Sequence, residues 1–236
     1  MRETDRSDDA CGVILCGGQS RRMGRDKALL TWPDQAPGSR TLLERTVDVL
    51  APLASEVWLA CGDESRYEAI HRLAGEGRVP VGSALDVFHE AGPLAGVHAG
   101  LVRSKSTWIL LAACDLPRIE TGLFAALLER AKARQLDVCM LQTEEAGGPR
   151  DHPSIAVLRR TVFEPVARSL GSGRRRLDAF HGEPGADGRA LAVGVLTERE
   201  LPIELRDRQI SLNLNTADDL ARERTQQPRN HREVAG

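Results

Sequence analysis

A glycine-rich loop with a run of positive charge follows the first apolar segment of the chain. The segment GVIL (12–15) leads into CGGQSRRMGRDK, in which Gly17 and Gly18 allow tight turns and close approach of a ligand to the backbone. Successive backbone N–H groups in such a loop can hold a phosphate group. Full positive charges are added by Arg21, Arg22, Arg25 and Lys27. The loop therefore predicts a phosphate site, and a solvated glycine turn is the alternative.

The loop departs from the two commonest phosphate-binding patterns. A P-loop requires GxxxxGK followed by Ser or Thr, whereas residues 24–27 read GRDK and are followed by Ala. A dinucleotide fingerprint requires GxGxxG, whereas Gly17 and Gly18 are followed by no glycine before Gly24. A dinucleotide-binding oxidoreductase is therefore disfavoured, although Asp63 after the second predicted strand would suit a ribose.

Two further stretches carry residue types suited to the same chemistry. The stretch CDLP (114–117) follows the most apolar segment of the chain, and a carboxylate such as Asp115 beside a polyphosphate usually holds Mg²⁺. The alternative for Asp115 is a cap of the following turn. The stretch GPLAG (92–96) places small residues at the start of a helical pattern. Small residues at this place let a flat ligand approach the backbone. The alternative is that they allow the helix to pack closely on its neighbours.

The elements that must position these stretches alternate along the first half of the chain. Apolar strand segments at 12–16, 56–61, 78–81, 107–114 and 137–141 are separated by helical patterns at 41–53, 65–75, 92–104 and 121–135. This alternation predicts an α/β fold, a single-domain Rossmann-like doubly wound, mainly parallel sheet with helices on both faces. Ligands bind such sheets outside the carboxyl ends of the strands, where all three stretches fall.

The second half of the chain is less regular. We expect a strand at 154–158 that could pair antiparallel, a helix near 159–170, a basic centre within 171–189 that could be helical, and a strand at 190–196. A last helix would be capped by Thr216. The predicted organisation is one domain over residues 11–225, with a disordered N-terminus at 1–10 and a disordered tail at 226–236.

Composition limits the class of protein. The 236 residues are 41% hydrophobic with a net charge of −2, which is against a general nucleic-acid binder. No apolar run approaches the roughly 18–20 residues that cross a bilayer, and the polar first ten residues do not form a secretory signal. A cytoplasmic protein without nucleic-acid or membrane partners is expected. The 5 cysteines include no CxxC pair, which favours buried thiols over disulfides or zinc.

The loop closely resembles the signature of nucleotidyltransferases that transfer NMP from an NTP, in particular the molybdenum cofactor guanylyltransferases. That family also carries GPLAG, Cys-Asp-x-Pro, Arg-Asp-His-Pro before a strand, and Asn-x-Asn-Thr near its end. The resemblance covers about residues 11–225. The matching stretches occur in the same order at 92–96, 114–117, 150–153 and 213–216.

The resemblance implies transfer of GMP from GTP to the terminal phosphate of molybdenum-molybdopterin, with release of pyrophosphate and with Mg²⁺ as cofactor. It implies catalytic roles for Arg22, Lys27 and Asp115, with Asp115 as the metal ligand. The implied nucleotide site consists of Leu15, Cys16, Gly17, Gly18, Lys27, Asp86, Gly92, Pro93, Leu94 and Asp115. The implied pterin site consists of Arg150, His152, Arg174, Arg175, Asn213 and Asn215.

Several alternatives stay open. The family usually has an asparagine after its second strand, whereas this chain reads ACGD at 60–63, where Asp63 could substitute. A cytidylyltransferase for the same pterin, another NTP transferase of the superfamily and a non-catalytic GTP-binding module are the rivals. GTP is favoured because the first loop and GPLAG look like the guanine type. Transient contact with molybdenum-inserting or acceptor proteins is a further expectation, and the oligomeric state is not predicted.

Overall fold

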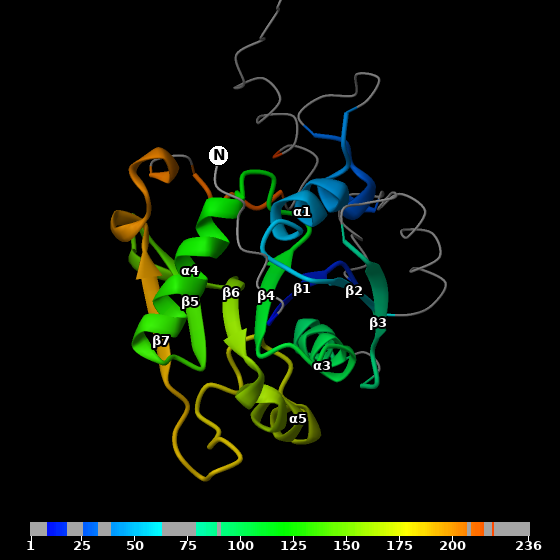
Figure 1. Cartoon of the computed structure of the whole chain (residues 1–236), viewed down its shortest axis with the longest axis vertical. Coiled ribbons are helices and arrows are strands. Elements are labelled where there is room, and N and C mark those ends of the chain that lie inside the picture. The colour runs from blue at the N-terminus through cyan, green and yellow to red at the C-terminus, as the bar shows by residue number, and fades with distance from the viewer. Residues whose placement is uncertain are drawn as a thin grey trace, which may run out of the picture.

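A single mixed sheet of seven strands organises the part of the chain that the structure describes. This computed structural model describes residues 9–17, 26–32, 39–62, 79–88, 91–206, 209–214 and 219. Within them the strand order is β3-β2-β1-β4-β6-β5-β7 (Figure 1). The strands are β1 (Ala10–Leu15), β2 (Val57–Gly62), β3 (Val81–Leu85), β4 (Trp108–Ala113), β5 (Val138–Glu145), β6 (Gly148–Arg159) and β7 (Val193–Thr197).

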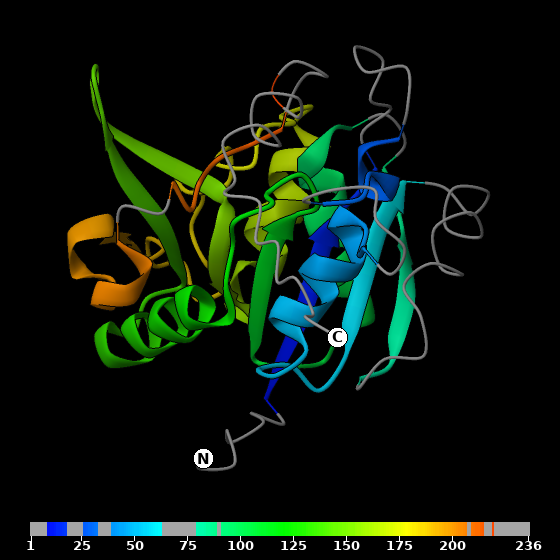
Figure 2. The ribbon, with the colours of Figure 1, turned by 90° about the horizontal axis from the view of Figure 1, so that it is seen from above.

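Helices cover both faces of this sheet, as the sequence predicts. The α-helices in the described ranges are α1 (Leu42–Leu50), α3 (Pro93–Arg103), α4 (Thr121–Arg134) and α5 (Phe163–Gly171). Figure 2 shows α1 and α4 on one side of the sheet and α3 and α5 on the other. Each pair closes its own apolar core, with Phe124 of α4 buried in one and Val166 of α5 in the other. No helix in the described ranges is long and apolar enough to cross a membrane.

The parallel half of the sheet contains the reversal of strand order that creates a ligand crevice. Strand β1 pairs in parallel with β2 on one side and with β4 on the other, and β2 continues to β3. The chain therefore first builds outward from β1 through β2 and β3, and then crosses to β4. In open α/β sheets the carboxyl ends of the strands at such a reversal form the binding crevice.

The other half of the sheet is mixed because β6 runs against both of its neighbours. Strand β6 pairs antiparallel with β4 and with β5, and β5 then pairs in parallel with β7. The antiparallel pairing expected for 154–158 is thus confirmed. Strands β5 and β6 are longer than predicted because their polar ends pair with each other, as in Gln142 opposite Asp151.

Some boundaries differ from the prediction. Strand β1 begins at Ala10, a fully buried residue, so the N-terminal segment expected to be disordered extends one residue too far. The predicted strand at 78–81 is found at Val81–Leu85, and α5 begins at Phe163 after the 3-10 helix η2 (Arg160–Val162). The predicted helix at 65–75 and the tail at 226–236 lie outside the described residues.

Candidate active site

The crevice is formed where β1 and β4 end side by side. The backbone N–H of Cys114 donates to the carbonyl of Leu15 at 3.2 Å, so the hydrogen bonding between the two strands continues one residue beyond the end of β4. On the other side, a Cβ added to Gly17 would lie 3.3 Å from the backbone carbonyl carbon and oxygen of Cys61. A glycine is favoured at this position because the loop leaves β1 pressed against the end of β2.

An ion pair joins Lys27 and Asp115, the two charged residues that the sequence analysis placed at these strand ends. Lys27 Nζ lies 3.2 Å from Asp115 Oδ2, and the two side chains are 16% and 17% exposed. Lys27 begins the 3-10 helix η1 (Lys27–Leu29), whose N-cap Asp26 accepts a hydrogen bond from Ala28 N at 3.0 Å. The cap fixes where η1 starts, and with it the direction from which Lys27 enters the crevice.

Two buried oxygen atoms at the crevice could hold a metal ion. The backbone N–H of Leu214 donates to the carbonyl of Asp115 at 3.0 Å, which brings Asn213 beside the carboxylate. Asp115 Oδ1 and Asn213 Oδ1 are both buried without a hydrogen-bond partner in the described ranges. Oxygen donors of this kind fit Mg²⁺, which takes one or two protein ligands and completes its shell with water and phosphate. No cluster of three His, Cys, Asp or Glu side chains suited to a metal occurs among the described residues.

Arg45 of α1 supports the loop that carries Asp115, and sequence reasoning missed it. One guanidinium nitrogen donates to the carbonyl of Pro117 at 3.3 Å, while Arg45 Nε is buried and has no partner in the described ranges. Burial lowers the pKa of the Arg45 guanidinium, against the opposing charges of Asp48 and Glu120. The only sign of this role in the sequence was that Arg45 is a charged residue next to the apolar positions of an amphipathic helix.

Helix α3 approaches the strand ends closely because two of its residues have no side chain. A Cβ on Gly96 would lie 2.9 Å from Leu15 Cδ2, and one on Gly100 would lie 2.5 Å from Val13 Cγ2. The N-cap Gly92 has φ of 73°, a left-handed conformation that favours glycine, and Pro93 follows at the first helical position. The stretch GPLAG therefore combines close packing with a helix N-terminus at the crevice.

Asp86 follows β3 at the same edge of the sheet. Its backbone N–H donates to the carbonyl of Gly62, the last residue of β2, at 3.3 Å. Residues Leu15, Cys16, Gly17, Lys27, Asp86 and Asp115 therefore all lie at the carboxyl ends of the parallel strands or just beyond. Cys16 also brings its sulfur within 3.3 Å of Cys61 Sγ, a contact between neighbouring strand ends that the sequence did not suggest.

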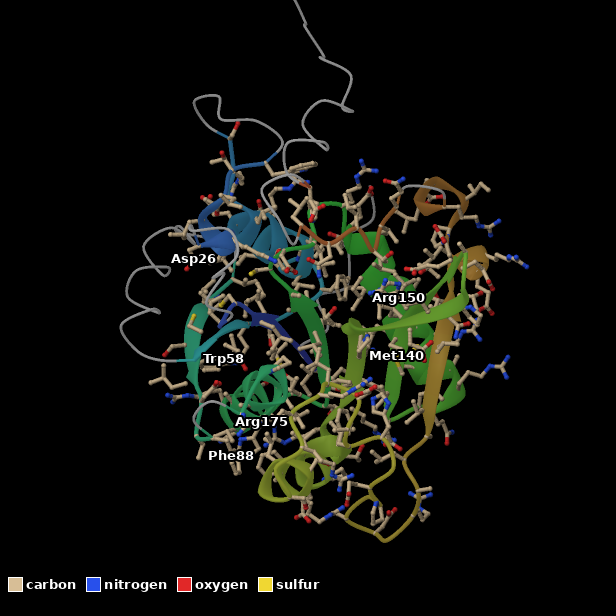
Figure 3. All side chains as sticks on the ribbon, turned by 180° about the vertical axis from the view of Figure 1, so that it is seen from behind. Asp26, Trp58, Phe88, Met140, Arg150 and Arg175 are labelled. Carbon is tan, nitrogen blue, oxygen red and sulfur yellow. The ribbon has the colours of Figure 1, made fainter. Side chains whose placement is uncertain are left out.

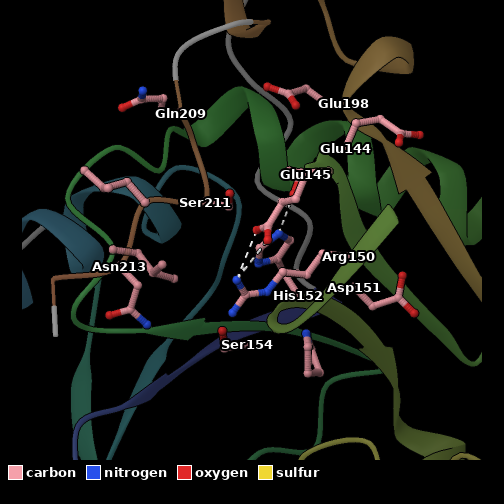
Figure 4. Close-up of a pocket in the computed structure, with 14 residues that line it drawn as sticks. Glu144, Glu145, Arg150, Asp151, His152, Ser154, Glu198, Gln209, Ser211 and Asn213 are labelled. Carbon is pink, nitrogen blue, oxygen red and sulfur yellow. Dashed lines mark hydrogen bonds and ion pairs between the residues drawn. The ribbon is translucent and has the colours of Figure 1, made fainter. Parts of the chain in front are cut away.

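A second feature, a pocket of about 700 Å³, opens beside Asn213 and extends along the end of the β5–β6 hairpin (Figure 4). His152 Nε2 lies 2.7 Å from Thr143 Oγ1, and burial is the main cause that lowers the His152 pKa. Arg150 donates to Glu145 at 3.0 Å. The pocket is lined by Leu116, Thr143, Glu144, Glu145, Arg150, Asp151, His152, Pro153, Ser154, Glu198, Gln209, Ser211, Leu212 and Asn213.

A bulge in the hairpin shapes this pocket. Met140 pairs with Ala156, whereas the next residue of β5, Leu141, pairs with His152. Three residues of β6 are therefore inserted between these two pairs, and the bend carries the RDHP stretch away from the plane of the sheet. Pro153 and Ser154, which belong to the inserted residues, line the pocket.

The arginine run lies elsewhere. The backbone oxygen and Cβ of Arg175 lie 3.4 and 3.3 Å from the position of a Cβ on Gly92, so this residue packs on the start of α3. Arg174 pairs with Glu183, and Arg176 pairs with Asp178 at 2.7 Å. Figure 3 shows Arg175 and Arg150 on separate parts of the molecule. The residues expected to bind the pterin are thus divided between the pocket, with Arg150, His152 and Asn213, and the start of α3.

Comparison with known proteins decides the family. The model of the MobA-like NTP transferase domain matches residues 12–184. The chain belongs to the MobA-like NTP transferase domain family. A probable molybdenum cofactor guanylyltransferase of Chloroflexus aggregans is 32% identical to it over 89% of this chain and 90% of the relative. The molybdenum cofactor guanylyltransferase of Pseudomonas putida is 33% identical over 70% of this chain and 78% of the relative.

Solved structures share the fold of this MobA-like chain. Molybdopterin-guanine dinucleotide biosynthesis protein A from Archaeoglobus fulgidus superposes with a TM-score of 0.69 at 21% identity, covering 92% of this chain and 97% of the other. The 2-C-methyl-D-erythritol 4-phosphate cytidylyltransferase from Thermus thermophilus gives a TM-score of 0.60 at 16% identity, covering 90% of this chain and 96% of the other.

The family match contains most of the candidate site of this MobA-like protein. Lys27, Asp115 and the RDHP stretch lie within residues 12–184, whereas Asn213 lies beyond them. The expected site residues Gly18, Arg22 and Asn215, and also Asp63, lie outside the described residues. Their roles remain predictions.

Proposed function

We propose that this chain is a molybdenum cofactor guanylyltransferase, which transfers GMP from GTP to the terminal phosphate of molybdopterin and releases pyrophosphate. The observation that carries the proposal is the meeting of Lys27, Asp115 and Asn213 at the strand reversal between β1 and β4. The names of the curated relatives over most of the chain support the choice of reaction.

The reaction needs no protein nucleophile. An oxygen of the terminal phosphate of molybdopterin attacks the α-phosphorus of GTP, a new P–O bond forms, and the bond to the bridging oxygen breaks with release of pyrophosphate. A phosphate monoester has its second pKa near about 6, so the attacking oxygen is already largely ionised at neutral pH. The protein has to align two polyanions and stabilise the charge that develops on the leaving group.

The residues of the crevice suit these two tasks. Lys27 brings a full positive charge to the loop after β1, where backbone N–H groups can also receive phosphate oxygens. Asp115 and Asn213 would hold Mg²⁺, because each has a buried oxygen without a partner in the described ranges. The ion would neutralise charge on the phosphates of GTP. Arg45 keeps the Asp115 loop in place through Pro117.

A cytidylyltransferase is the nearest rival, since one of the proteins that shares this fold uses that chemistry by name. The deciding experiment incubates the protein with molybdopterin, Mg²⁺ and each of GTP, CTP, ATP and UTP in turn. Pyrophosphate release and the mass of the pterin product are measured, with Asp115→Asn as the inactive control. GMP transfer is expected, and a CMP adduct or the absence of any adduct would contradict the proposal.

A further inference from the structure

The pocket at the β5–β6 hairpin carries an excess of negative charge, which would repel a phosphate group. Among the described residues, its lining includes four carboxylates, from Glu144, Glu145, Asp151 and Glu198, but only one guanidinium, from Arg150. That guanidinium is engaged by Glu145 at 3.0 and 3.3 Å. Burial lowers the His152 pKa, so its imidazole is neutral at pH 7 and adds no positive charge. A group that enters this pocket gains more from donating hydrogen bonds than from carrying negative charge.

Glu198 is one of the two carboxylates in the pocket lining, with Glu144, whose side chains have no partner among the described residues. Glu145 is paired with Arg150, and Asp151 accepts a hydrogen bond from Gln142 at 2.8 Å. The side chain of Glu198 makes no hydrogen bond or ion pair with any other residue that the structure describes. Glu198 opens the 3-10 helix η3 (Glu198–Glu200) directly after β7.

The pairing of β7 with β5 brings Glu198 to the pocket. Thr197, the last residue of β7, pairs with Gln142 of β5, and Glu198 follows it as the first residue of η3. Glu198 lines the pocket together with Thr143, which is the hydrogen-bond partner of His152. Glu144, the next residue of β5, is exposed.

The opposite end of the pocket reaches the catalytic crevice. Figure 4 shows Asn213 across the pocket from Glu198. Asn213 is followed by Leu214, whose N–H is bound to the carbonyl of Asp115. A substrate lying along the pocket would thus have one end at Asp115 and the other at Glu198. Its charged phosphate belongs at the first end, where Lys27 and the metal ligands are.

We infer that the pocket binds the ring end of the substrate, a 2-amino-4-oxopteridine, and that Glu198 is the residue that recognises it. The pyrimidine edge of such a ring presents N3–H and the 2-amino group side by side. Two parallel donors match the two oxygens of a carboxylate, as they do in a bidentate pair with arginine. The inference rests on the proposed function, because that function supplies a pterin as the substrate.

The test compares two small ring probes that lack a phosphate. One is 6-hydroxymethylpterin, and the other is 6-hydroxymethyllumazine, in which a carbonyl replaces the 2-amino group and abolishes the donor pair. Binding is followed through the fluorescence of the rings. The wild-type protein is expected to bind the pterin about tenfold more tightly, the ratio that about 1.4 kcal/mol of free energy produces.

Two matched variants test whether Glu198 is the source of the preference for the pterin. Glu198→Gln is expected to weaken pterin binding about tenfold and to remove the preference over lumazine, because a neutral amide cannot accept two hydrogen bonds as strongly. Glu204→Gln removes the same charge from an exposed residue of the 3-10 helix η4 (Ile203–Leu205), outside the pocket lining, and is expected to change pterin binding less than about twofold. Thermal unfolding of each variant shows whether it is folded.

Three results would overturn the inference. They are equal affinity for the two rings, unchanged pterin binding by folded Glu198→Gln, and competition of inorganic phosphate with the pterin. The proposed function fails separately, in the assay of GMP transfer. A protein that binds the pterin ring with the expected preference but transfers no GMP supports the ring site and contradicts the proposed function.

Discussion

Lys27 Nζ lies 3.2 Å from Asp115 Oδ2, which links the loop after β1 to the loop after β4. The two side chains are only 16% and 17% exposed, so the pair is screened by water less than an ion pair on the surface. A divalent cation at Asp115 has to share the carboxylate with this ammonium group. A triphosphate in the crevice would offer Lys27 another anionic partner and so leave the carboxylate to the metal.

Asp115→Asn should lower the rate of GMP transfer by about a hundredfold or more while the fold is retained, because the metal loses a charged ligand. The rate is measured at several Mg²⁺ concentrations, and far-UV circular dichroism checks the fold. Lys27→Met should instead raise the KM for GTP, with a smaller change in Mg²⁺ dependence. If Asp115→Asn transferred GMP with a normal Mg²⁺ dependence, the metal would be held elsewhere.

The neighbouring arginines 174 and 175 should differ in their effect on substrate use. Arg174 is engaged by Glu183, whereas Arg175 lies at the start of α3 and forms no ion pair with another described residue. Arg175→Ala is therefore expected to raise the KM for molybdopterin by about tenfold, since charged hydrogen bonds to phosphate are among the stronger ones. Arg174→Ala should change that KM little.

Isothermal titration of GTP into both arginine variants completes this comparison. GTP affinity should stay within about twofold of the wild type, because the ordinary contribution of an exposed charge is small. If Arg175→Ala weakened GTP binding and left the KM for molybdopterin unchanged, the arginine would belong to the triphosphate.

The stability of the protein should fall as the pH drops below about 6.5. His98 of α3 is buried between Phe88 and Phe163, and burial lowers its pKa from the ordinary value of 6.5. The unfolded chain then takes up the proton more readily than the folded protein, so acid favours unfolding. His98→Gln should flatten the dependence of the unfolding midpoint on pH below the ordinary histidine pKa of 6.5.

Some slope should remain in that variant, because the pKa values of His152 and His181 are also lowered by burial. The pH dependence of the unfolding midpoint is compared with that of His181→Gln, which removes one of these other histidines and keeps His98. An unfolding midpoint whose pH dependence is the same in His98→Gln and the wild type would show that His98 does not contribute.

Gly100→Ala should destabilise the protein by about 1–3 kcal/mol, because the new methyl group would overlap Val13 of β1. Shortening Val13 to alanine makes room for that methyl group, so the double variant should lose less stability than the sum of the single changes. Urea unfolding measures each free energy.

Gly171→Ala is the control for a glycine without neighbours, since a Cβ there meets nothing within 4 Å. It should be neutral or slightly stabilising, because alanine favours the helical state over glycine. Additive losses in the Val13 and Gly100 double variant would contradict the contact as the cause.

The parallel half of the fold and its ligand edge could be predicted because each strand is a short apolar run with a distinctive residue at its end. Asp115 was found in this way, since it lies two residues after the end of the buried strand β4. The hairpin extension from Gln142 to Asp151 was not found, because its residues are mostly polar. Apolar periodicity carries no signal for such a segment.

Contacts between distant segments could not be predicted from spacing. The approach of Arg175 to Gly92 and the support of Pro117 by Arg45 join residues more than seventy positions apart. Glu198 was not considered as a site residue because it stands in an ordinary charged sequence, TERE, and only the pairing of β7 with β5 brings it to the pocket.

The central place of β4 has a consequence for the order in which the protein is made. The ribosome completes β4 before it begins β6, yet β6 is the neighbour of β4 on the side away from β1. During that interval an apolar strand presents an open edge, a template for pairing with other chains. Asn213 leaves the ribosome later still, so a nascent chain can form the Lys27–Asp115 pair well before Asn213 joins it at the crevice.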